Sequence, residues 1–172
     1  SLPPGSSTET YAALLRGLRD VGRRVWVDTS GVALAAALKV ESVGIKVNCS
    51  EAEAIVGRAI ETTTDALAAA HELHERTGAP VALTLGELGA VLVSETGSWL
   101  ARPPALNIVS TVGSGDAFLA GLVVALAEGT TEPEALRRAV AAGAANARSI
   151  GGGRFDLDEF NAILSQTRIN GG

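Results

Sequence analysis

Apolar residues recur along this chain at two spacings, one typical of helices and the other typical of strands. Tyr11 and Leu18 fall two turns apart on one helical face, and Gly22 stands where helices commonly end. Comparable spacing predicts helices over residues 8–21, 32–40, 51–58, 65–77, 115–128, 132–149 and 157–165. Thr131 and Glu134 are spaced as a capping box at the start of one of them.

Short runs rich in β-branched and aliphatic residues lie between these helices. They predict strands over residues 25–28, 43–47, 80–85, 89–94, 98–101 and 106–109. Strands that alternate with helices indicate an α/β fold with a mostly parallel sheet. The short spacers 86–88 and 95–97 indicate an antiparallel hairpin edge. In such sheets, ligands collect beyond the carboxyl ends of the strands.

Length and composition narrow the class of protein. The 172 residues favour a single domain over residues 1–172, and we find no internal repeat or low-complexity linker. Hydrophobic residues make up 47% and charged residues 19%, as in a globular chain. No apolar stretch is long enough to span a membrane, and no signal peptide is recognisable. We therefore expect no membrane partner.

Charge and cysteine content point to a cytoplasmic protein with no nucleic-acid partner. The formal net charge is −5, which argues against nucleic acid as the main partner. Cys49 is the one cysteine in the sequence, so an internal disulfide is impossible. A reducing, cytoplasmic compartment is the expected location.

A glycine-rich turn between a predicted strand and a helix suits the binding of a phosphate. The run Gly113-Ser114-Gly115-Asp116 leaves backbone N–H groups uncovered at the positive end of the helix dipole. It is no Walker A loop, because Asp116 stands where a lysine is needed, and Phe118 excludes a dinucleotide fingerprint. Asp116 could accept a proton from a substrate hydroxyl, or it could simply complement the helix dipole.

Two further segments at strand ends could contact a ligand. Thr84, Gly86 and Gly89 place a hydroxyl and two glycines where the backbone can approach a nucleotide, although an ordinary hairpin has the same pattern. Residues 46–51 offer a lysine, an amide and a carboxylate at the end of another strand. These groups suit a metal–phosphate shell, while Asn48 with Glu51 is equally the pattern of a capping box.

Together these segments resemble one family. The order and spacing of five motifs are similar to those of the PfkB (ribokinase-like) carbohydrate kinases, closest in style to the 1-phosphofructokinase and tagatose-6-phosphate kinase branches. The motifs are Ser1-Leu2-Pro3-Pro4-Gly5, Asp28-Thr29-Ser30-Gly31, Lys46-x-Asn48-x-x-Glu51, Thr84-Leu85-Gly86-x-x-Gly89-Ala90 and Thr111-Val112-Gly113-Ser114-Gly115-Asp116. The resemblance implies a ribokinase-like three-layer sandwich and ATP-dependent phosphorylation of a sugar phosphate.

The resemblance also implies roles for the residues around the transferred phosphate. Asp116 matches the catalytic base, and the amides of residues 113–115 match an anion hole for the transferred phosphoryl group. Asn48 and Glu51 match residues that organise Mg²⁺, largely through water, and Lys46 lies nearby against phosphate.

Other matched residues concern the nucleotide and the acceptor. Thr84 and Gly86 match contacts to the nucleotide phosphates, in a loop that Gly89 completes. Asn146 matches a residue near the adenine, and Ser1 matches a contact to the sugar phosphate.

The chain departs from the family pattern in two ways. Ser110 stands where many members have Asp or Asn, so dependence on a monovalent cation is open. The family's N-terminal strands and lid, often used for dimerisation, are not recognisable. We therefore expect a C-terminal portion of a longer, homodimeric kinase, inactive alone. The alternatives are a non-catalytic nucleotide-binding module of the same fold, or a nucleoside or vitamin kinase.

Some residues that could carry chemistry are expected to have ordinary roles. His71 and His74 lie three residues apart on a predicted helix, and we expect a solvated face rather than a metal pair. Trp26 and Trp99 are expected to pack rather than to stack on bases.

Overall fold

The computed structural model describes residues 5–7 and 9–171. The predicted contact of Ser1 lies outside the described residues. The chain divides into two compact units. The first comprises Ser1–Leu83 with Val93–Thr96, and the second comprises Thr84–Leu92 with Gly97–Gly172.

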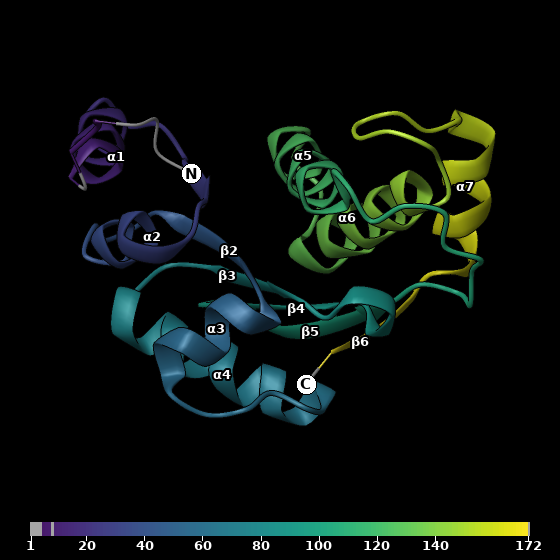
Figure 1. Cartoon of the computed structure of the whole chain (residues 1–172), viewed down its shortest axis with the longest axis horizontal. Coiled ribbons are helices and arrows are strands. Elements are labelled where there is room, and N and C mark those ends of the chain that lie inside the picture. The colour runs from purple at the N-terminus through teal and green to yellow at the C-terminus, as the bar shows by residue number, and fades with distance from the viewer. Residues whose placement is uncertain (1–4, 8, 172) are drawn as a thin grey trace. The chain divides into compact units, whose positions relative to one another are not determined.

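The first unit contains strands that alternate with helices (Figure 1). Its elements are α1 (Thr10–Asp20), β1 (Trp26–Asp28), α2 (Gly31–Ala37), β2 (Gly44–Asn48), α3 (Cys49–Val56), α4 (Thr63–Thr77) and β3 (Val81–Thr84), whose last residue begins the second unit. β1 and β2 pair in parallel, with Val27 opposite Ile45, and both of these side chains are buried. α1 packs against α2, and α3 packs against α4 and β2.

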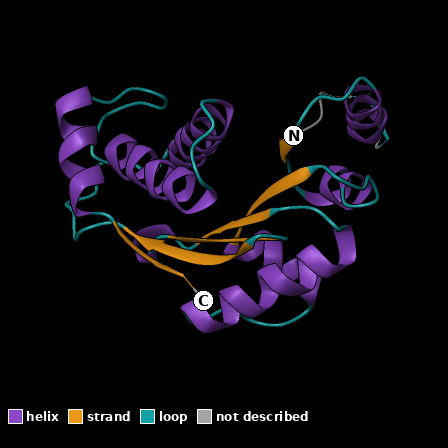
Figure 2. Cartoon of the chain, turned by 180° about the vertical axis from the view of Figure 1, so that it is seen from behind, coloured by secondary structure: helices purple, strands orange, loops and turns teal. Residues whose placement is uncertain are grey.

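The second unit holds a helical layer and an antiparallel strand pair. Its elements are η1 (Gly86–Leu88), β4 (Ala90–Ser94), β5 (Gly97–Arg102), α5 (Ser114–Ala127), α6 (Glu132–Ala147), α7 (Leu157–Gln166) and β6 (Arg168–Gly171), and the last two residues of β4 belong to the first unit. α6 packs against α5, α7 and β5. β6 runs antiparallel to β5, and the C-terminus follows it directly (Figure 2).

The strands form a mixed sheet in the order β1-β2-β3-β4-β5-β6. This arrangement confirms the predicted α/β class. Among the described residues, no helix is long and apolar enough to cross a membrane.

Two predicted strand assignments differ from the structure. The predicted strand 106–109 is wrong, because this segment is an extended loop that runs along α6. The N–H groups of Val109 and Ser110 both donate to the carbonyl of Ala147, at 2.8 and 3.1 Å, and Leu106 packs against the core between α6 and α7. Leu106 therefore contacts helices instead of filling a sheet, while the side chains of Ile108 and Val109 stay about half exposed. β6 was not predicted, because it is short and largely exposed and shows no apolar pattern.

Side chains cap the starts of helices α3, α4 and α7. α3 begins with a complete capping box of Asn48 and Glu51. The predicted box at α6 is wrong: Thr131 is the N-cap residue, but its side chain accepts no capping hydrogen bond. Glu134 instead binds the guanidinium groups of Arg137 and Arg138, at 2.8 and 3.2 Å. A charge-assisted pair outweighs one backbone cap at this partly exposed position.

Candidate nucleotide site

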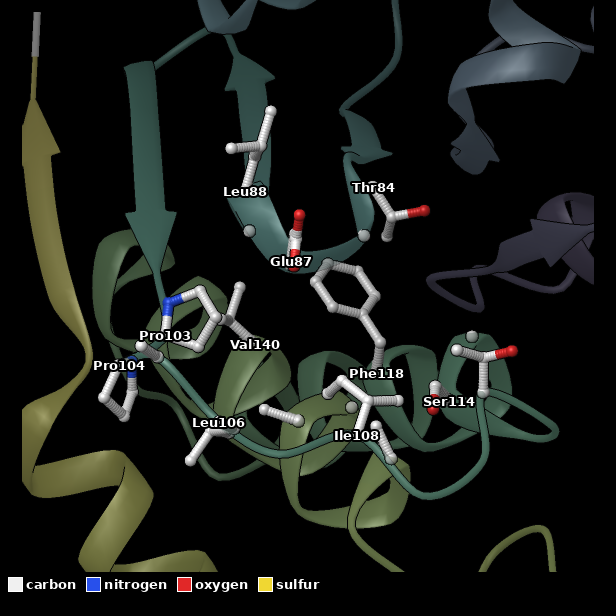
Figure 3. Close-up of a pocket in the computed structure, with 18 residues that line it drawn as sticks. Thr84, Glu87, Leu88, Pro103, Pro104, Leu106, Ile108, Ser114, Phe118 and Val140 are labelled. Carbon is white, nitrogen blue, oxygen red and sulfur yellow. The ribbon is translucent and has the colours of Figure 1, made fainter.

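A cavity of about 720 Å³ lies within the second unit (Figure 3). This size suits a small-molecule ligand. Its walls are mostly apolar, with side chains from the 103–108 loop and from helices α5 and α6, namely Pro103, Pro104, Leu106, Ile108, Phe118 and Val140. Among the lining residues, all of them described, Glu87 carries the one formal charge. The cavity therefore favours a flat, uncharged group over an ion along most of its length.

The η1 turn forms one rim of the cavity, and the structure explains its two glycines, Gly86 and Gly89, in different ways. Gly86 has a φ of +60°, and a Cβ there would meet nothing within 4 Å, so its backbone is open to a ligand. Gly89 has a φ of +97°, and a Cβ there would lie 1.9 Å from the carbonyl oxygen of Ala101. Gly89 is thus required by the close approach of β5. Thr84, at the end of β3, also lines the cavity, and Figure 3 shows the Phe118 ring projecting from α5 toward this turn.

The amino end of α5 forms the opposite rim. Gly113 is the N-cap residue with a φ of +77°, and Ser114 and Gly115 line the cavity. The N–H of Ser114 donates to the Thr111 carbonyl at 3.2 Å. Within the described chain, the N–H groups of Gly115 and Asp116 have no backbone acceptor. These two N–H groups, at the positive end of the helix dipole, are available to an anion.

Asp116 follows in the first turn of α5 and is exposed. Its carboxylate makes no hydrogen bond or ion pair within the part of the chain that the structure describes. It is free to accept a proton from a ligand held beside Gly115. A carboxylate at this position also stabilises the helix dipole.

Asn146 is fully buried in α6 and lies behind the amino end of α5. Its Nδ2 donates to the Val112 carbonyl at 2.9 Å and to Ser114 Oγ at 3.1 Å, and its Oδ1 accepts from the N–H of Gly153 at 2.7 Å. Asn146 does not line the cavity. Its amide therefore forms hydrogen bonds to the segments around the start of α5 and not to the cavity.

Gly143, on the same helix, lets α5 and α6 come close together. A Cβ at Gly143 would lie 3.1 Å from the Ser114 carbonyl oxygen and 3.4 Å from Phe118 Cβ. Gly143 also lines the cavity. A larger side chain there would push on the helix start and fill part of the cavity.

The other predicted site residues belong to the first unit. Lys46 Nζ donates to Asp28 Oδ2 at 2.8 Å, and the lysine side chain is only 7% exposed. Asn48 Oδ1 accepts from the N–H of Glu51 at 3.0 Å, and Glu51 Oε2 accepts from the N–H of Asn48 at 2.9 Å. The capping alternative is therefore observed. It leaves Glu51 Oε1 without a protein partner in the described region.

The donor set in this unit fits Mg²⁺ only as a phosphate-bound ion. Among the described residues, no group of three His, Cys, Asp or Glu side chains could hold a metal. Mg²⁺ commonly keeps several waters and binds through one or two carboxylates plus substrate phosphates. Glu51, with one carboxylate oxygen still open, matches that limited contribution.

The residues that the sequence assigned ordinary roles mostly keep them. A Cβ on Gly44 would lie 2.5 Å from the ring of Trp26, which shows how tightly that ring packs. His71 is exposed, whereas His74 is half-buried with its Nδ1 2.7 Å from the Ala79 carbonyl. Burial, and secondarily the charge of Glu53, raises the pKa of the Cys49 thiol above its ordinary value.

Sequence reasoning located the polar rims of the cavity and missed its apolar walls. Pro103, Pro104 and Ile108 carry no motif, and the 103–108 segment lines a cavity only because it runs along α6. Phe118 is buried in the α5 helix and also lines the cavity, a role that the sequence did not indicate. The proline pair directly after a strand was the one available signal of a loop here.

The α/β sheet, the glycine-rich helix start and the cavity with apolar walls fit the fold of the ribokinase-like kinases. The chain matches the pfkB family carbohydrate kinases over residues 1–158, and it belongs to this family. It is 34% identical to the 1-phosphofructokinase of Escherichia coli K12 over 98% of its length. It is 42% identical to that of Rhodobacter capsulatus over 82% of its length.

The same similarity appears among solved structures. Phosphofructokinase-2 from Escherichia coli, in complex with potassium, superposes with a TM-score of 0.88 at 33% identity over 95% of this chain. The chain spans about half the length of these relatives: 54% of the Escherichia coli 1-phosphofructokinase, 45% of the Rhodobacter capsulatus enzyme and 54% of phosphofructokinase-2.

Proposed function

We propose that this chain supplies the ATP site and the catalytic base of a kinase that phosphorylates a hydroxyl of a sugar phosphate, of the 1-phosphofructokinase or tagatose-6-phosphate kinase type. One observation carries the proposal. The cavity joins apolar walls to a helix start whose Gly115 and Asp116 N–H groups lack backbone acceptors in the described chain. A nucleotide has the matching chemistry, with a flat base at one end and phosphates at the other.

The apolar walls suit adenine. Pro103, Ile108 and Phe118 offer flat or branched surfaces for the two faces of the ring, and Gly143 lines the same cavity without a side chain. The phosphates would then reach the α5 start, where the helix dipole and the unused N–H groups stabilise negative charge. Gly86 and Thr84, on the opposite rim, can approach the same phosphates.

Asp116 is proposed as the general base. It is exposed and has no partner in the described region, and it follows Gly115 directly on the helix. An acceptor hydroxyl beside the γ-phosphate would donate its proton to this carboxylate as the oxygen attacks phosphorus. The names of the relatives support a phosphorylated hexose as the acceptor.

Mg²⁺ would be held chiefly by the nucleotide phosphates, with Glu51, and Asn48 through water, from the chain. When bound, the ion would neutralise charge on the phosphates. Lys46, whose ammonium retains two further protons beside Asp28, is proposed to face phosphate as well.

The setting of the enzyme is also a proposal. A cytoplasmic location and a homodimer remain predictions. One solved structure of phosphofructokinase-2 from Escherichia coli is a tetrameric inhibited form, which shows self-association in that relative.

The proposal is tested by release of ADP from ATP. The protein as encoded, with any residues its gene places before Ser1, is assayed with fructose 1-phosphate, fructose 6-phosphate and tagatose 6-phosphate. ADP release that requires one of these sugars supports the proposal. ATP binding without turnover on any of them, or on nucleosides and vitamin alcohols, would instead indicate the non-catalytic module. Turnover on a nucleoside or a vitamin alcohol alone would instead indicate a nucleoside or vitamin kinase.

A further inference from the structure

The side-chain amide of Asn146 joins three segments around the α5 start. It is 0% exposed, and it bonds the Val112 carbonyl, the Ser114 hydroxyl and the Gly153 N–H. The turn before α5 and the loop after α6 also meet backbone to backbone, since a Cβ on Gly113 would lie 2.6 Å from Gly152 Cα. The amide therefore fixes two loops that touch with no side chains between them.

The orientation of this amide follows from its backbone partners. A carbonyl oxygen can only accept a hydrogen bond, so the Val112 carbonyl requires Nδ2 on its side. A backbone N–H can only donate, so Gly153 requires Oδ1. Nδ2 therefore faces Ser114 as well, and Ser114 Oγ is the acceptor in that 3.1 Å bond.

This arrangement determines what the Ser114 hydroxyl can do. The hydroxyl has one proton, and its oxygen already accepts from Asn146, so the proton points to another partner. Ser114 lines the cavity and has no second side-chain hydrogen bond among the described residues. The free proton is thus available to an acceptor in the cavity, next to the Gly115 N–H.

We propose that Asn146 is a positioning residue that makes the Ser114 hydroxyl a dedicated donor to a phosphate oxygen of the nucleotide. The inference rests on the proposed function, because it assumes that the phosphates reach the α5 start. Without the amide, a serine in a first helical turn can turn its hydroxyl toward nearby backbone groups instead. Asn146 removes that freedom before the ligand arrives.

The test is a double-mutant cycle of Ser114→Ala and Asn146→Asp, followed by calorimetric titration with Mg-ATP and, separately, with adenosine. Asn146→Asp keeps the size and the acceptor for Gly153, but its carboxylate would accept the Ser114 proton. Each single variant should bind Mg-ATP about tenfold more weakly, the value of one hydrogen bond to a charged group. Adenosine, which has no phosphate, should bind each variant as it binds the unchanged chain. The second substitution should add much less than the first, because both remove the same donor.

Matched controls separate this role from general effects. Asn161→Asp and Ser165→Ala make the same chemical changes at exposed positions of α7, away from the cavity. They should leave both affinities unchanged. Thermal unfolding of every variant shows whether a loss of affinity merely follows a loss of folded protein.

The outcomes are distinguishable. No binding of Mg-ATP by the unchanged chain overturns the proposed function and this role with it. If Ser114→Ala binds Mg-ATP as tightly as the unchanged chain, the role of Asn146 alone is overturned. The same holds if the double variant loses the full tenfold for each of its two substitutions. Should Asn146→Asp fail to fold, Ser114→Ala decides, because it keeps the bonds of Asn146 to Val112 and Gly153. An unchanged affinity for Mg-ATP then overturns the proposal. A loss of affinity for Mg-ATP, with the affinity for adenosine unchanged, supports it.

Discussion

Lys46 and Asp28 stand directly opposite each other on the parallel strands β2 and β1, with Nζ 2.8 Å from Oδ2. The lysine side chain is 7% exposed and the aspartate side chain 23% exposed. An ammonium group removed so far from water is stable only beside a counter-charge. The pair therefore holds the carboxyl ends of two neighbouring strands in register.

The first prediction concerns this pair. Lys46→Met should lower the free energy of unfolding by about 3 kcal/mol, because it leaves the Asp28 carboxylate partly buried and uncompensated. Urea denaturation measures the change, and Lys39→Met is the control at an exposed position. The double variant Lys46→Met with Asp28→Leu should recover much of the loss. A Lys46→Met variant as stable as Lys39→Met would show that the pair contributes nothing.

A second prediction separates steric clash from backbone strain at two glycines with positive φ. Gly89→Ala should unfold the chain or destabilise it by at least about 3 kcal/mol, because a Cβ would lie 1.9 Å from the Ala101 carbonyl oxygen. Gly57 has a similar φ, but a Cβ there would meet open space, so Gly57→Ala should lower the free energy of unfolding by only about 1 kcal/mol. Equal losses of stability in the two variants would contradict the close approach of β5 to Gly89.

The third prediction is a pH dependence of stability. The hydrogen bond from Arg137, and then the one from Arg138, hold the pKa of Glu134 below its ordinary value of 4.5. A carboxyl with a lowered pKa in the folded state contributes stability above its unfolded value and loses it as the pH falls through the folded value. Thermal unfolding between pH 7 and pH 3 should therefore show a loss on acidification that Glu134→Gln reduces. Identical pH profiles for the two proteins would remove Glu134 from this role.

The fourth prediction concerns the base. In the protein as encoded, Asp116→Asn should lower kcat by roughly 10²–10⁴, the range for a general base, with little change in the affinity for ATP. Steady-state ADP release and calorimetry give the two quantities. Asp158→Asn is the matched control, since Asp158 is also an acid in the first turn of a helix. If Asp116→Asn turned over normally and lost only as much stability as Asp158→Asn, the helix-dipole role would be the correct one.

The sequence predicted the features that depend on neighbouring residues. The helix 65–77 was predicted because amphipathic spacing is a local property, and in the structure α4 ends at a left-handed Gly78. The turn at 113–115, with uncovered N–H groups at the start of α5, was predicted for the same reason, since small residues at a helix start leave N–H groups exposed.

Features that depend on tertiary contacts were not predictable in the same way. Leu106 and Val109 have the composition of a strand, but α6 supplies their partners, so no strand forms. The predicted capping box of Thr131 and Glu134 does not form, and the Glu134 carboxylate instead binds Arg137 and Arg138, which the capping pattern alone does not indicate. The contacts of Asn146 join residues 34 and 7 positions away, and no local pattern indicates them.

The central claim is that the cavity of the second unit binds the nucleotide. A ¹⁵N–¹H NMR titration of the 172-residue chain with Mg-ATP tests it most directly, because it gives the affinity and the site together. We predict weak, saturable binding. The Kd should be no smaller than about 1 μM, the lower end of the usual KM range of about 1 μM to 1 mM for enzyme substrates. The largest shifts should fall on the amides of Gly86, Gly115 and Gly143. Shifts that do not saturate, or saturable shifts that leave these three amides unmoved, would contradict the account.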